Sequence, residues 1–254
     1  MLLLHAGNAS EWTGPDGNNT YLLTGRAPAL IDAGVGHVAH LDAVTRALNG
    51  AALARVLITH GHADHVSGVP SILERWPSAL IRGGTGEPFR DGECIEIGDR
   101  VAVAVHTPGH SPDHFCFFDE TDGDLYCGDL VRAGGTVVIP ASRGGDLQQY
   151  LSSLVRVRML GARRLLPGHG PIIDNPSAII DDYIAHRAAR DRQILAAIAD
   201  GHTTPETIVS HVYGGLSPAL VSVAADSVLA HLIKLQREGR LAPDFAERRR
   251  ADGL

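Results

Sequence analysis

Cysteine and long apolar runs are both scarce in this sequence of 254 residues. The three cysteines, Cys94, Cys116 and Cys127, are odd in number and form no Cys-x-x-Cys pair. This pattern argues against a disulfide framework and a thiolate metal site, and it indicates a reducing compartment. No apolar run approaches the roughly 20 residues that span a bilayer, and residues 1–4 are too short and lack the basic leader of a signal peptide. We therefore expect a soluble, cytoplasmic protein without a membrane partner.

Basic residues are also fewer than acidic ones. Lysine and arginine number 22 against 29 aspartates and glutamates, so the net charge is -7. Such a balance argues against the cationic surface that non-specific nucleic-acid binding requires, although it leaves room for a local basic strip. With 44% hydrophobic and 20% charged residues the chain can bury a substantial core. The length permits one large domain or one domain with a smaller appendage.

Imidazole, in contrast, is concentrated in one short stretch. Residues 59–65 read THGHADH and follow the apolar run Val56–Ile58, which we expect to be a buried strand. A lone histidine among the 14 of this chain would be an ordinary surface or core residue, but here four ligand-type side chains fall within six positions. They are His60, His62, Asp64 and His65. Imidazole and carboxylate are ligands of borderline-soft divalent cations, so the stretch predicts a metal site.

The spacing within this stretch leaves room for a second ion. His60 and His62 form a His-x-His pair that presents two ligands from one turn. Asp64 and His65 follow that pair so closely in the chain that the four side chains cannot all point in the same direction. Two metal ions a few ångströms apart are a recurring device for hydrolysis. This hypothesis requires that other parts of the chain supply further ligands.

Further ligand-type residues occur where other predicted strands end. The expected strand 100–105 runs into a Pro-Gly turn that places His110 at its tip, and His110 is our candidate for a further ligand. The strand 125–127 ends at Gly128-Asp129, from which a carboxylate could bridge two ions. Another strand end carries His169 in a Pro-Gly-His-Gly turn. Strands and helices that alternate in this way, with ligands at strand ends, predict a layered α/β domain whose site lies at one sheet edge.

Two other polar residues leave alternatives open. His114 begins the apolar run 115–118, where it could face the site as a proton donor or have a structural role. Asp32 closes the expected strand 29–31, where it is either an exposed loop residue or a partner that orients metal ligands.

The order of these residues resembles the metallo-β-lactamase superfamily over roughly residues 5–180. The resemblance implies a four-layer αβ/βα sandwich of two central sheets with helices outside, and a site for two Zn²⁺, with Mn²⁺ or iron as alternatives. By this match, one ion would be held by His60, His62 and His110. The other would be held by Asp64, His65 and His169, and Asp129 would bridge the two.

One position in this pattern bears on function. Antibiotic-hydrolysing members of the superfamily usually have cysteine or serine where this chain has Asp129, so the resemblance disfavours β-lactam hydrolysis. The aspartate resembles the branches of glyoxalase II, lactonases and metal-dependent ribonucleases. Single-iron sulfur dioxygenases share much of the pattern and remain the weakest alternative.

The last third of the chain predicts three helices with short connections. They cover residues 175–199, a segment after Thr204-Pro205, and a longer helix from a cap at Ser217-Pro218 to Glu238, followed by a β-like tail at Arg240-Leu241. The order resembles a winged helix, and a sandwich with this appendage resembles the β-lactamase-like protein 2 group, which includes an endoribonuclease and thioesterases acting on carrier-bound polyketides. We expect a catalytic domain at 1–180 and a winged-helix-like domain at 181–254.

The predicted helix from Ser217-Pro218 to Glu238 would be the one that reads DNA in a winged helix. Its residues do not suit that role. Its apolar members include Leu220, Val221, Val223 and Val228, and Lys234 is its one lysine. A helix that reads base edges offers Arg, Lys, Asn or Gln. We therefore expect a packing or homodimer-contact module and no DNA partner.

Three functional hypotheses follow. A metal-bound hydroxide, oriented by Asp64 with His114 as a candidate proton donor, would hydrolyse an ester, thioester or lactone, on a small-molecule or carrier-bound substrate. Endonucleolytic cleavage of single-stranded RNA is the alternative, and its support is the basic cluster of Arg156, Arg158, Arg163 and Arg164. A non-enzymatic regulator would need closed ligand shells, whereas shared dinuclear sites leave room for water. The arginines at 248–250 are expected to form a solvated tail.

Overall fold

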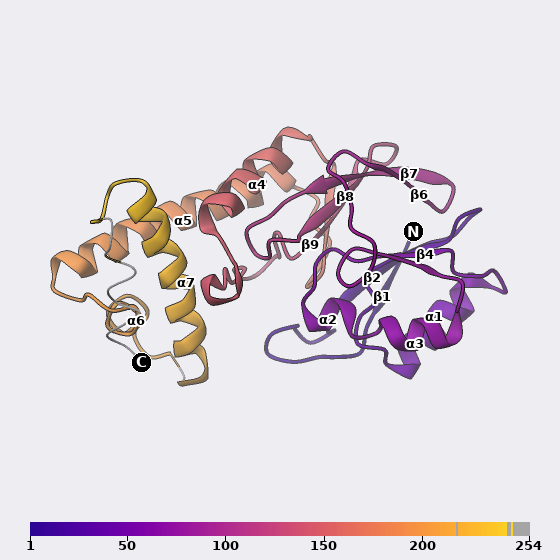
Figure 1. Cartoon of the computed structure of the whole chain (residues 1–254), viewed down its shortest axis with the longest axis horizontal. Helices are drawn as coiled ribbons and strands as arrows, with labels where there is room; N and C mark the ends of the chain where they lie inside the picture. Colours follow the sequence, from indigo (N-terminus) through magenta and orange to yellow (C-terminus); the bar gives the residue numbers. More distant parts are fainter. Residues whose placement is uncertain (217, 243–244, 246–254) are drawn as a thin grey trace.

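The computed structural model describes residues 1–216, 218–242 and 245, and it contains two five-stranded sheets (Figure 1). The first sheet has the order β1-β2-β3-β4-β5 and the second the order β10-β9-β8-β7-β6. The strands of the first are β1 (Leu2–His5), β2 (Asn19–Leu23), β3 (Ala29–Ile31), β4 (Arg55–Leu57) and β5 (Leu80–Arg82). Those of the second are β6 (Cys94–Ile97), β7 (Arg100–His106), β8 (Phe115–Asp119), β9 (Asp124–Gly128) and β10 (Arg164–Pro167).

Helices cover the outer faces of both sheets. The first sheet is associated with α1 (Val38–Leu48), α2 (Ala63–Val66) and α3 (Val69–Arg75). The second is covered by α4 (Leu147–Met159) and the first half of α5 (Pro176–Ala199), and a short 3-10 helix, η1 (Ala141–Arg143), precedes α4. Two more helices, α6 (Pro205–Tyr213) and α7 (Pro218–Arg237), pack on the second half of α5.

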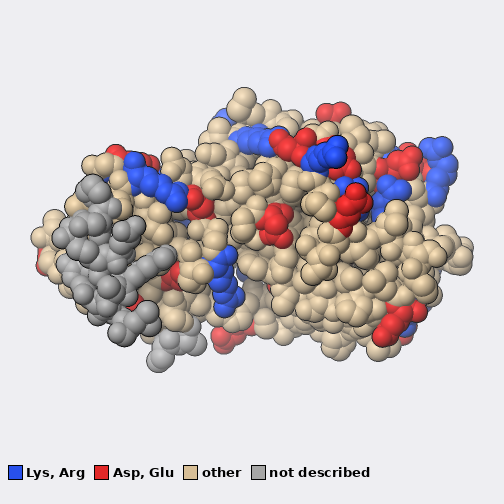
Figure 2. Space-filling view, viewed as in Figure 1, with Lys and Arg blue, Asp and Glu red and all other residues tan. Residues whose placement is uncertain are grey.

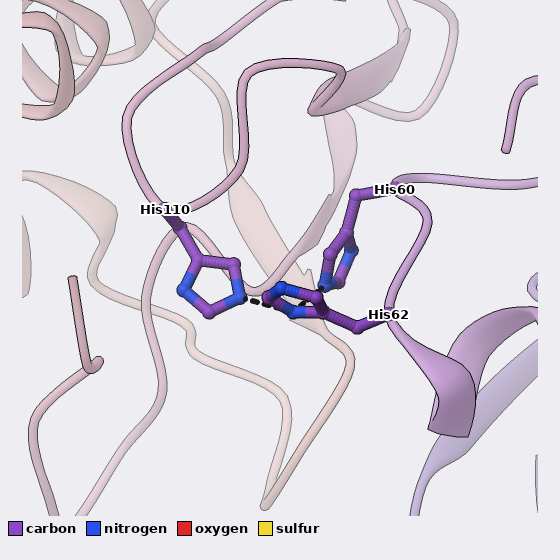
Figure 3. Close-up of side chains that lie close together, drawn as sticks. All are labelled: His60, His62 and His110. Carbon is purple, nitrogen blue, oxygen red and sulfur yellow. Dashed lines mark hydrogen bonds between the residues drawn. The ribbon is translucent and has the colours of Figure 1, made fainter. Parts of the chain in front are cut away.

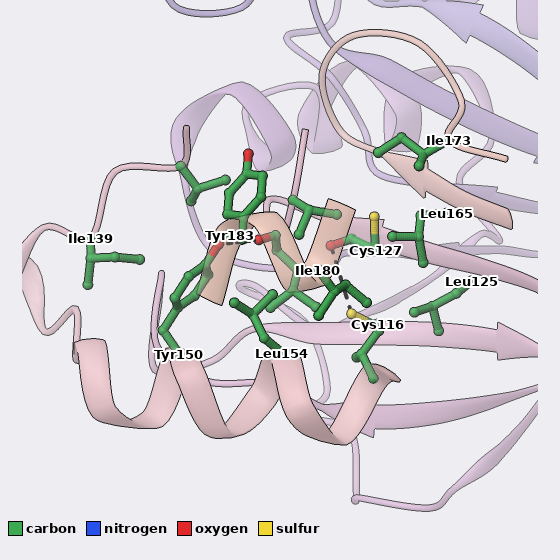
Figure 4. Close-up of a cluster of buried hydrophobic side chains, with 14 of the residues drawn as sticks. Cys116, Leu125, Cys127, Ile139, Tyr150, Leu154, Leu165, Ile173, Ile180 and Tyr183 are labelled. Carbon is green, nitrogen blue, oxygen red and sulfur yellow. Dashed lines mark hydrogen bonds between the residues drawn. The ribbon is translucent and has the colours of Figure 1, made fainter. Parts of the chain in front are cut away.

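The four layers follow from the alternation of side chains along each strand. In β2, Tyr21 and Leu23 enter the core between the sheets, whereas Leu22 packs on the outer side with Leu41 and Val44 of α1. The second sheet repeats the arrangement: Tyr126 faces inward, while Leu125 and Cys127 face α4 and α5 (Figure 4). The predicted sandwich fold is confirmed.

Strand direction decides where the site can form. β3 and β4 are parallel, and β7, β9 and β10 share one direction because β7 and β9 are each antiparallel to β8 and β10 is parallel to β9. The carboxyl ends of strands that share a direction meet at one edge of a sheet. The segments that follow these five strands therefore gather where the two sheets face each other.

Gly68 separates α2 from α3, and a Cβ at this position would lie 2.3 Å from the backbone oxygen of Ala33. The backbone of the helical segment therefore packs directly against the end of β3, which interrupts the helix. The tail at Arg240–Leu241 forms a bend and not the expected strand. The predicted cap at Ser217 and the arginines at 248–250 lie outside the described residues.

The two hydrophobic cores share one helix. Ile180 and Tyr183 of α5 pack in the sandwich core, while Ile194 and Ala197 of the same helix pack against α6 and α7. The helix is continuous across residue 180, where we predicted a domain boundary, and that boundary stays a prediction. Within the described part of the chain, none of the helices has the length and apolar character of a membrane span.

A buried ionic cluster joins α5 to α7. The Asp191 carboxylate accepts hydrogen bonds from Nδ1 of His231 at 2.6 Å and Nζ of Lys234 at 2.7 Å, and all three residues are buried. Burial alone would raise the pKa of Asp191, but its hydrogen bonds to His231 and Lys234 lower that pKa. The ionised carboxylate is therefore part of the packing between these two helices.

We predict that Asp191→Ala lowers the free energy of unfolding by about 3 kcal/mol, because removing the carboxylate leaves the Lys234 ammonium buried and partly uncompensated. Urea unfolding at pH 7 measures this change. The matched control is Asp182→Ala on an exposed position of the same helix, for which a change within about 0.5 kcal/mol is expected. Equal stability of the two variants would contradict a stabilising role for the cluster.

Candidate metal centre

Three histidines converge at the sheet edge to form a first ligand group. His60 and His62 follow β4, and His110 lies in the turn after β7. Nδ1 of His62 lies 2.9 Å from Nε2 of His60 and 2.9 Å from Nε2 of His110. Figure 3 shows the three rings pointing toward one another from two separate loops.

Hydrogen bonds on the far side of these rings fix where their protons lie. The Thr59 hydroxyl donates to the Asp32 carboxylate, so it accepts from Nδ1 of His60 at 3.0 Å. Nδ1 of His110 donates to the backbone oxygen of Val138 at 2.7 Å. Both rings therefore present an Nε2 lone pair toward His62, which is the tautomer that binds a metal ion.

A second ligand group lies beside the first. Nε2 of His65 is 3.5 Å and Nε2 of His169 is 3.3 Å from Oδ2 of Asp64. The same carboxylate oxygen accepts a hydrogen bond of 3.0 Å from the amide of Asn18. These side chains come from α2, the loop after β10 and the start of β2, which meet only in the folded chain.

Asp129 lies between the two groups. Its Oδ1 is 3.5 Å from Nε2 of His65 and 3.3 Å from Nε2 of His169, and its Oδ2 is 3.7 Å from Nε2 of His110. Oδ1 is buried and has no hydrogen-bond partner. An orphaned carboxylate oxygen is costly unless a cation or donor satisfies it, so its position fits a bridging ligand.

The donor set as a whole fits divalent ions. The ligand atoms of His60, His62 and His110 lie within 4.8 Å of one another, as do those of Asp64, His65 and His169. For metal–nitrogen bonds of about 2.0–2.1 Å, tetrahedral ligands lie about 3.3 Å apart, close to the 2.9 Å separations in the first group. The structure therefore brings together all seven predicted ligands, in the two predicted groups, with Asp129 between them.

The charges of the site support the same assignment. Burial lowers the pKa of His60 and of His110, which keeps these rings neutral. Burial would also lower the pKa of His169, but the Asp129 and Asp64 carboxylates raise it to about 9. Burial would raise the pKa of Asp129, but His65 and His169 hold it well below its usual range. Cationic charge is thus favoured beside the two carboxylates.

Asp32 is buried and orients ligands of both groups. Its carboxylate accepts from the backbone N–H of Thr59 at 2.8 Å and from Nδ1 of His65 at 2.8 Å. Its backbone has a φ of 60°, an uncommon left-handed conformation for a residue other than glycine. Of the two readings left open from the sequence, the structure favours the ligand-orienting one.

His114 does not have the geometry of a proton donor to substrate. It is fully buried, Nδ1 lies 2.8 Å from the Thr107 hydroxyl, and Nε2 accepts from the backbone N–H of Asp129 at 3.2 Å. Burial lowers its pKa to about 3. The geometry therefore corrects that candidate role: His114 holds the backbone of Asp129 and has no free nitrogen to protonate a leaving group.

The ligands open onto two adjoining hollows between the sandwich and α7. One has a volume of about 950 Å³ and the other about 460 Å³, and both are lined by Asp64, His110 and Trp12. Val223 of α7 lines both hollows on the opposite side. The apolar face of α7 is thus used in packing and in the cavity wall.

Sequence reasoning did not identify Trp12 or α7 as parts of this cavity wall. Trp12 is 49% exposed in the Gly- and Pro-containing segment before β2. A tryptophan in a turn-rich segment near predicted ligands would have been a usable signal in the sequence. The contribution of α7 could not be read from the sequence because its apolar face is equally typical of a core helix.

Each arginine of the cluster that supported an RNA substrate has an aspartate partner. Arg156 pairs with Asp91, Arg158 with Asp181, and Arg163 and Arg164 with Asp124. In Figure 2 blue and red groups alternate along the upper edge of the molecule, so that face shows no continuous basic track. Ion pairs of this kind are typical of a solvated surface.

A sandwich with two groups of histidine and aspartate ligands at one edge has the features of a metal-binding protein. The sequence comparisons identify its family. The family described as "Metallo-beta-lactamase superfamily" matches residues 13–89 and 77–169, and the family "Beta-lactamase associated winged helix domain" matches residues 204–244. The chain belongs to the metallo-β-lactamase superfamily, whose members are generally hydrolytic enzymes, and it carries a C-terminal winged helix.

Curated relatives match this chain over most of its length and most of their own. The lactamase-like protein vrtG of Penicillium aethiopicum is 33% identical over 94% of this chain and 82% of its own. The β-lactamase-like protein 2 homolog of Caenorhabditis elegans is 31% identical over 88% of this chain and 80% of its own. The atrochrysone carboxyl ACP thioesterase of Aspergillus fumigatus is 32% identical over 79% of this chain and 69% of its own. The predicted likeness to the β-lactamase-like protein 2 group is confirmed.

Solved structures support the complete architecture. A metallo-β-lactamase family protein from Thermus thermophilus superposes with a TM-score of 0.78 at 25% identity and covers 94% of this chain and 93% of its own. A likeness that extends over nearly the whole of both chains includes the C-terminal helices as well as the sandwich.

We predict that Asp32→Ala weakens zinc binding by about 10- to 100-fold, because His65 loses the acceptor that sets its tautomer and Thr59 loses the partner that orients it toward His60. Competition with a chromogenic chelator measures the affinity. Asp16→Ala changes an exposed aspartate of the N-terminal segment and serves as the control. Unaltered zinc affinity in a folded Asp32→Ala protein would show that the carboxylate does not orient the ligands.

Proposed function

We propose that this protein is a dinuclear metal-dependent hydrolase of esters, thioesters or lactones. The observation that carries the proposal is a pair of His/Asp ligand groups, joined by Asp129, in the wall of a large cavity. When bound, two divalent ions would supply a water that ionises near neutral pH and a Lewis acid for the developing negative charge.

The protein's own side chains would position the substrate and limit access of water. Asn18 holds the Asp64 carboxylate with a hydrogen bond of 3.0 Å, and Asp64 faces both hollows. Trp12 and the apolar side chains Val223 and Leu229 line the larger hollow opposite the ligands. An apolar wall facing polar ligands suits an acyl group next to a reactive carbonyl.

The substrate class is supported by a relative and by the surface charge. One relative acts on an acyl carrier protein thioester, according to its name, and a carrier-bound or small-molecule acyl substrate fits the cavity. Single-stranded RNA is the weaker alternative because the arginines that would support it are paired with aspartates. The free cysteines Cys94, Cys116 and Cys127 are compatible with a reducing cytoplasmic environment.

Zinc is the metal we propose, with Mn²⁺ or iron as alternatives. Imidazole and carboxylate donors suit all three ions. A solved structure with 26% identity and a TM-score of 0.54 is titled as a di-iron-bound form, which keeps iron in consideration. Metal content also separates the hydrolase from a single-iron sulfur dioxygenase, since the proposal requires two ions per chain.

We predict that His62→Ala lowers kcat/KM for nitrophenyl ester, thioester or lactone hydrolysis by at least about 100-fold and lowers the bound metal, because His62 is common to both contacts of the first ligand group. Metal content is measured by mass spectrometry and activity on all three substrates and on single-stranded RNA. His5→Ala, at an exposed position in β1, should match the wild type. Full activity in a metal-free His62→Ala protein would refute the scheme.

A further inference from the structure

The smaller hollow has a cationic wall. Arg132 lies after β9, and Arg187 and Arg190 lie three positions apart on one face of α5. All three line the same hollow as the candidate ligands Asp129 and His169. Within the part of the chain that the structure describes, none of the three is paired with a carboxylate, although Glu11 and the candidate ligands Asp64 and Asp129 also line this hollow.

Arg187 is the most buried of the three, with 4% of its surface exposed. Its Nη2 donates to the Thr136 hydroxyl at 3.2 Å and to the backbone oxygen of Val137, and its guanidinium lies over the Tyr150 ring at 5.5 Å. Its Nε has no hydrogen-bond partner. A buried guanidinium that meets only neutral acceptors lacks the counter-charge that normally offsets its desolvation.

Arg132 and Arg190 have similar unused donors. Nη1 of Arg132 donates to the backbone oxygen of Trp12 at 2.9 Å, and the guanidinium of Arg190 lies 3.9 Å from the centroid of the Tyr213 ring. In both residues Nε is buried and has no hydrogen-bond partner. The contacts with Trp12 and Tyr213 fix both side chains at the hollow without neutralising their charge.

The contrast with the surface arginines is informative. Arg156, Arg158 and Arg164 each pair with an aspartate on the surface, whereas Arg132, Arg187 and Arg190 have no such partner and line the hollow beside the candidate metal ligands. Three cations close together repel one another unless an anion lies between them. Guanidinium groups bind carboxylate and phosphate oxygens through two parallel hydrogen bonds.

We propose that the smaller hollow binds an anionic oxygen group of the substrate, a carboxylate or a phosphate, remote from the bond that is hydrolysed. This inference rests on the proposed hydrolase function and names a feature of its substrate. A hollow of about 460 Å³ fits a small anionic group. The paired arginines outside it offer no continuation for a nucleic-acid backbone, so the anion belongs to a small or carrier-bound acyl substrate.

The test compares two nitrophenyl esters that differ in charge. The hydrogen glutarate ester carries a remote carboxylate, and the pentanoate ester is its neutral counterpart. Arg190→Gln should lower the ratio of kcat/KM for the anionic ester to that for the neutral ester by about 10-fold or more, mainly through KM, because a charge-assisted hydrogen bond is lost. Arg190→Lys should restore part of the ratio.

A control and a binding measurement separate this inference from the proposed function. Arg192→Gln changes an exposed arginine on the same helix outside the hollow and should leave the ratio unchanged. Calorimetric titration of the metal-loaded protein with glutarate and with inorganic phosphate measures anion binding without turnover. Arg190→Gln should weaken it by about 10-fold, and the anion that binds the wild type more tightly identifies the source of the oxygen group.

Each result has a defined meaning. If the wild type cleaves neither ester but binds glutarate or phosphate through Arg190, the ester-hydrolase proposal fails and the anion site stands. If Arg190→Gln changes neither the ratio nor anion binding, the anion site is overturned while ester hydrolysis can stand. If Arg190→Gln impairs cleavage of single-stranded RNA alone, the assignment to a small acyl substrate is likewise overturned.

Discussion

The candidate metal centre depends on the buried carboxylate of Asp32. This group accepts hydrogen bonds from Thr59 and from Nδ1 of His65, and Thr59 in turn accepts from His60. One side chain at the end of β3 thus sets the proton positions of one imidazole in each ligand group. Because Asp32 is buried, its interactions are poorly screened by water. A carboxylate in this place favours rings whose lone pairs face the site, and it does so for both groups at once.

Much of the site was predictable because its ligands follow strand ends that are readable in the sequence. Apolar runs that contain β-branched residues, such as Val56–Ile58, mark β4, and the turn residues after them carry the imidazoles. Direction and pairing then determine whether those turns meet. The sequence indicated the order of the ligands, and the family resemblance supplied their grouping. The role of Asp32 stayed open, because a single aspartate after a strand is equally typical of a loop.

The residues that sequence reasoning missed are those whose role depends on distant partners. Arg156 and Arg187 look alike in the sequence, yet one pairs with Asp91 on the surface and the other is buried beside the site without a carboxylate. His114 was a candidate proton donor because it begins the apolar run 115–118, from which it could face the site. Its ring instead packs in the interior and binds the backbone of Asp129. Burial and partners of this kind arise from tertiary packing, which a local pattern does not encode.

The C-terminal helices contribute to the site because the chain fixes α7 at two points. Ser142 donates to Asp226 through both its backbone N–H, at 2.8 Å, and its hydroxyl, at 2.7 Å. Arg237 pairs with Asp146 at 2.5 Å. These contacts tie the middle and the carboxyl end of α7 to η1 and to the N-cap of α4, and the continuous helix α5 packs in two hydrophobic clusters. Val223 and Leu229 of α7 are thereby held over the candidate metal ligands, where they form an apolar wall of the larger hollow. In the proposed hydrolase, this wall would enclose the acyl part of the substrate because apolar surface there is removed from water.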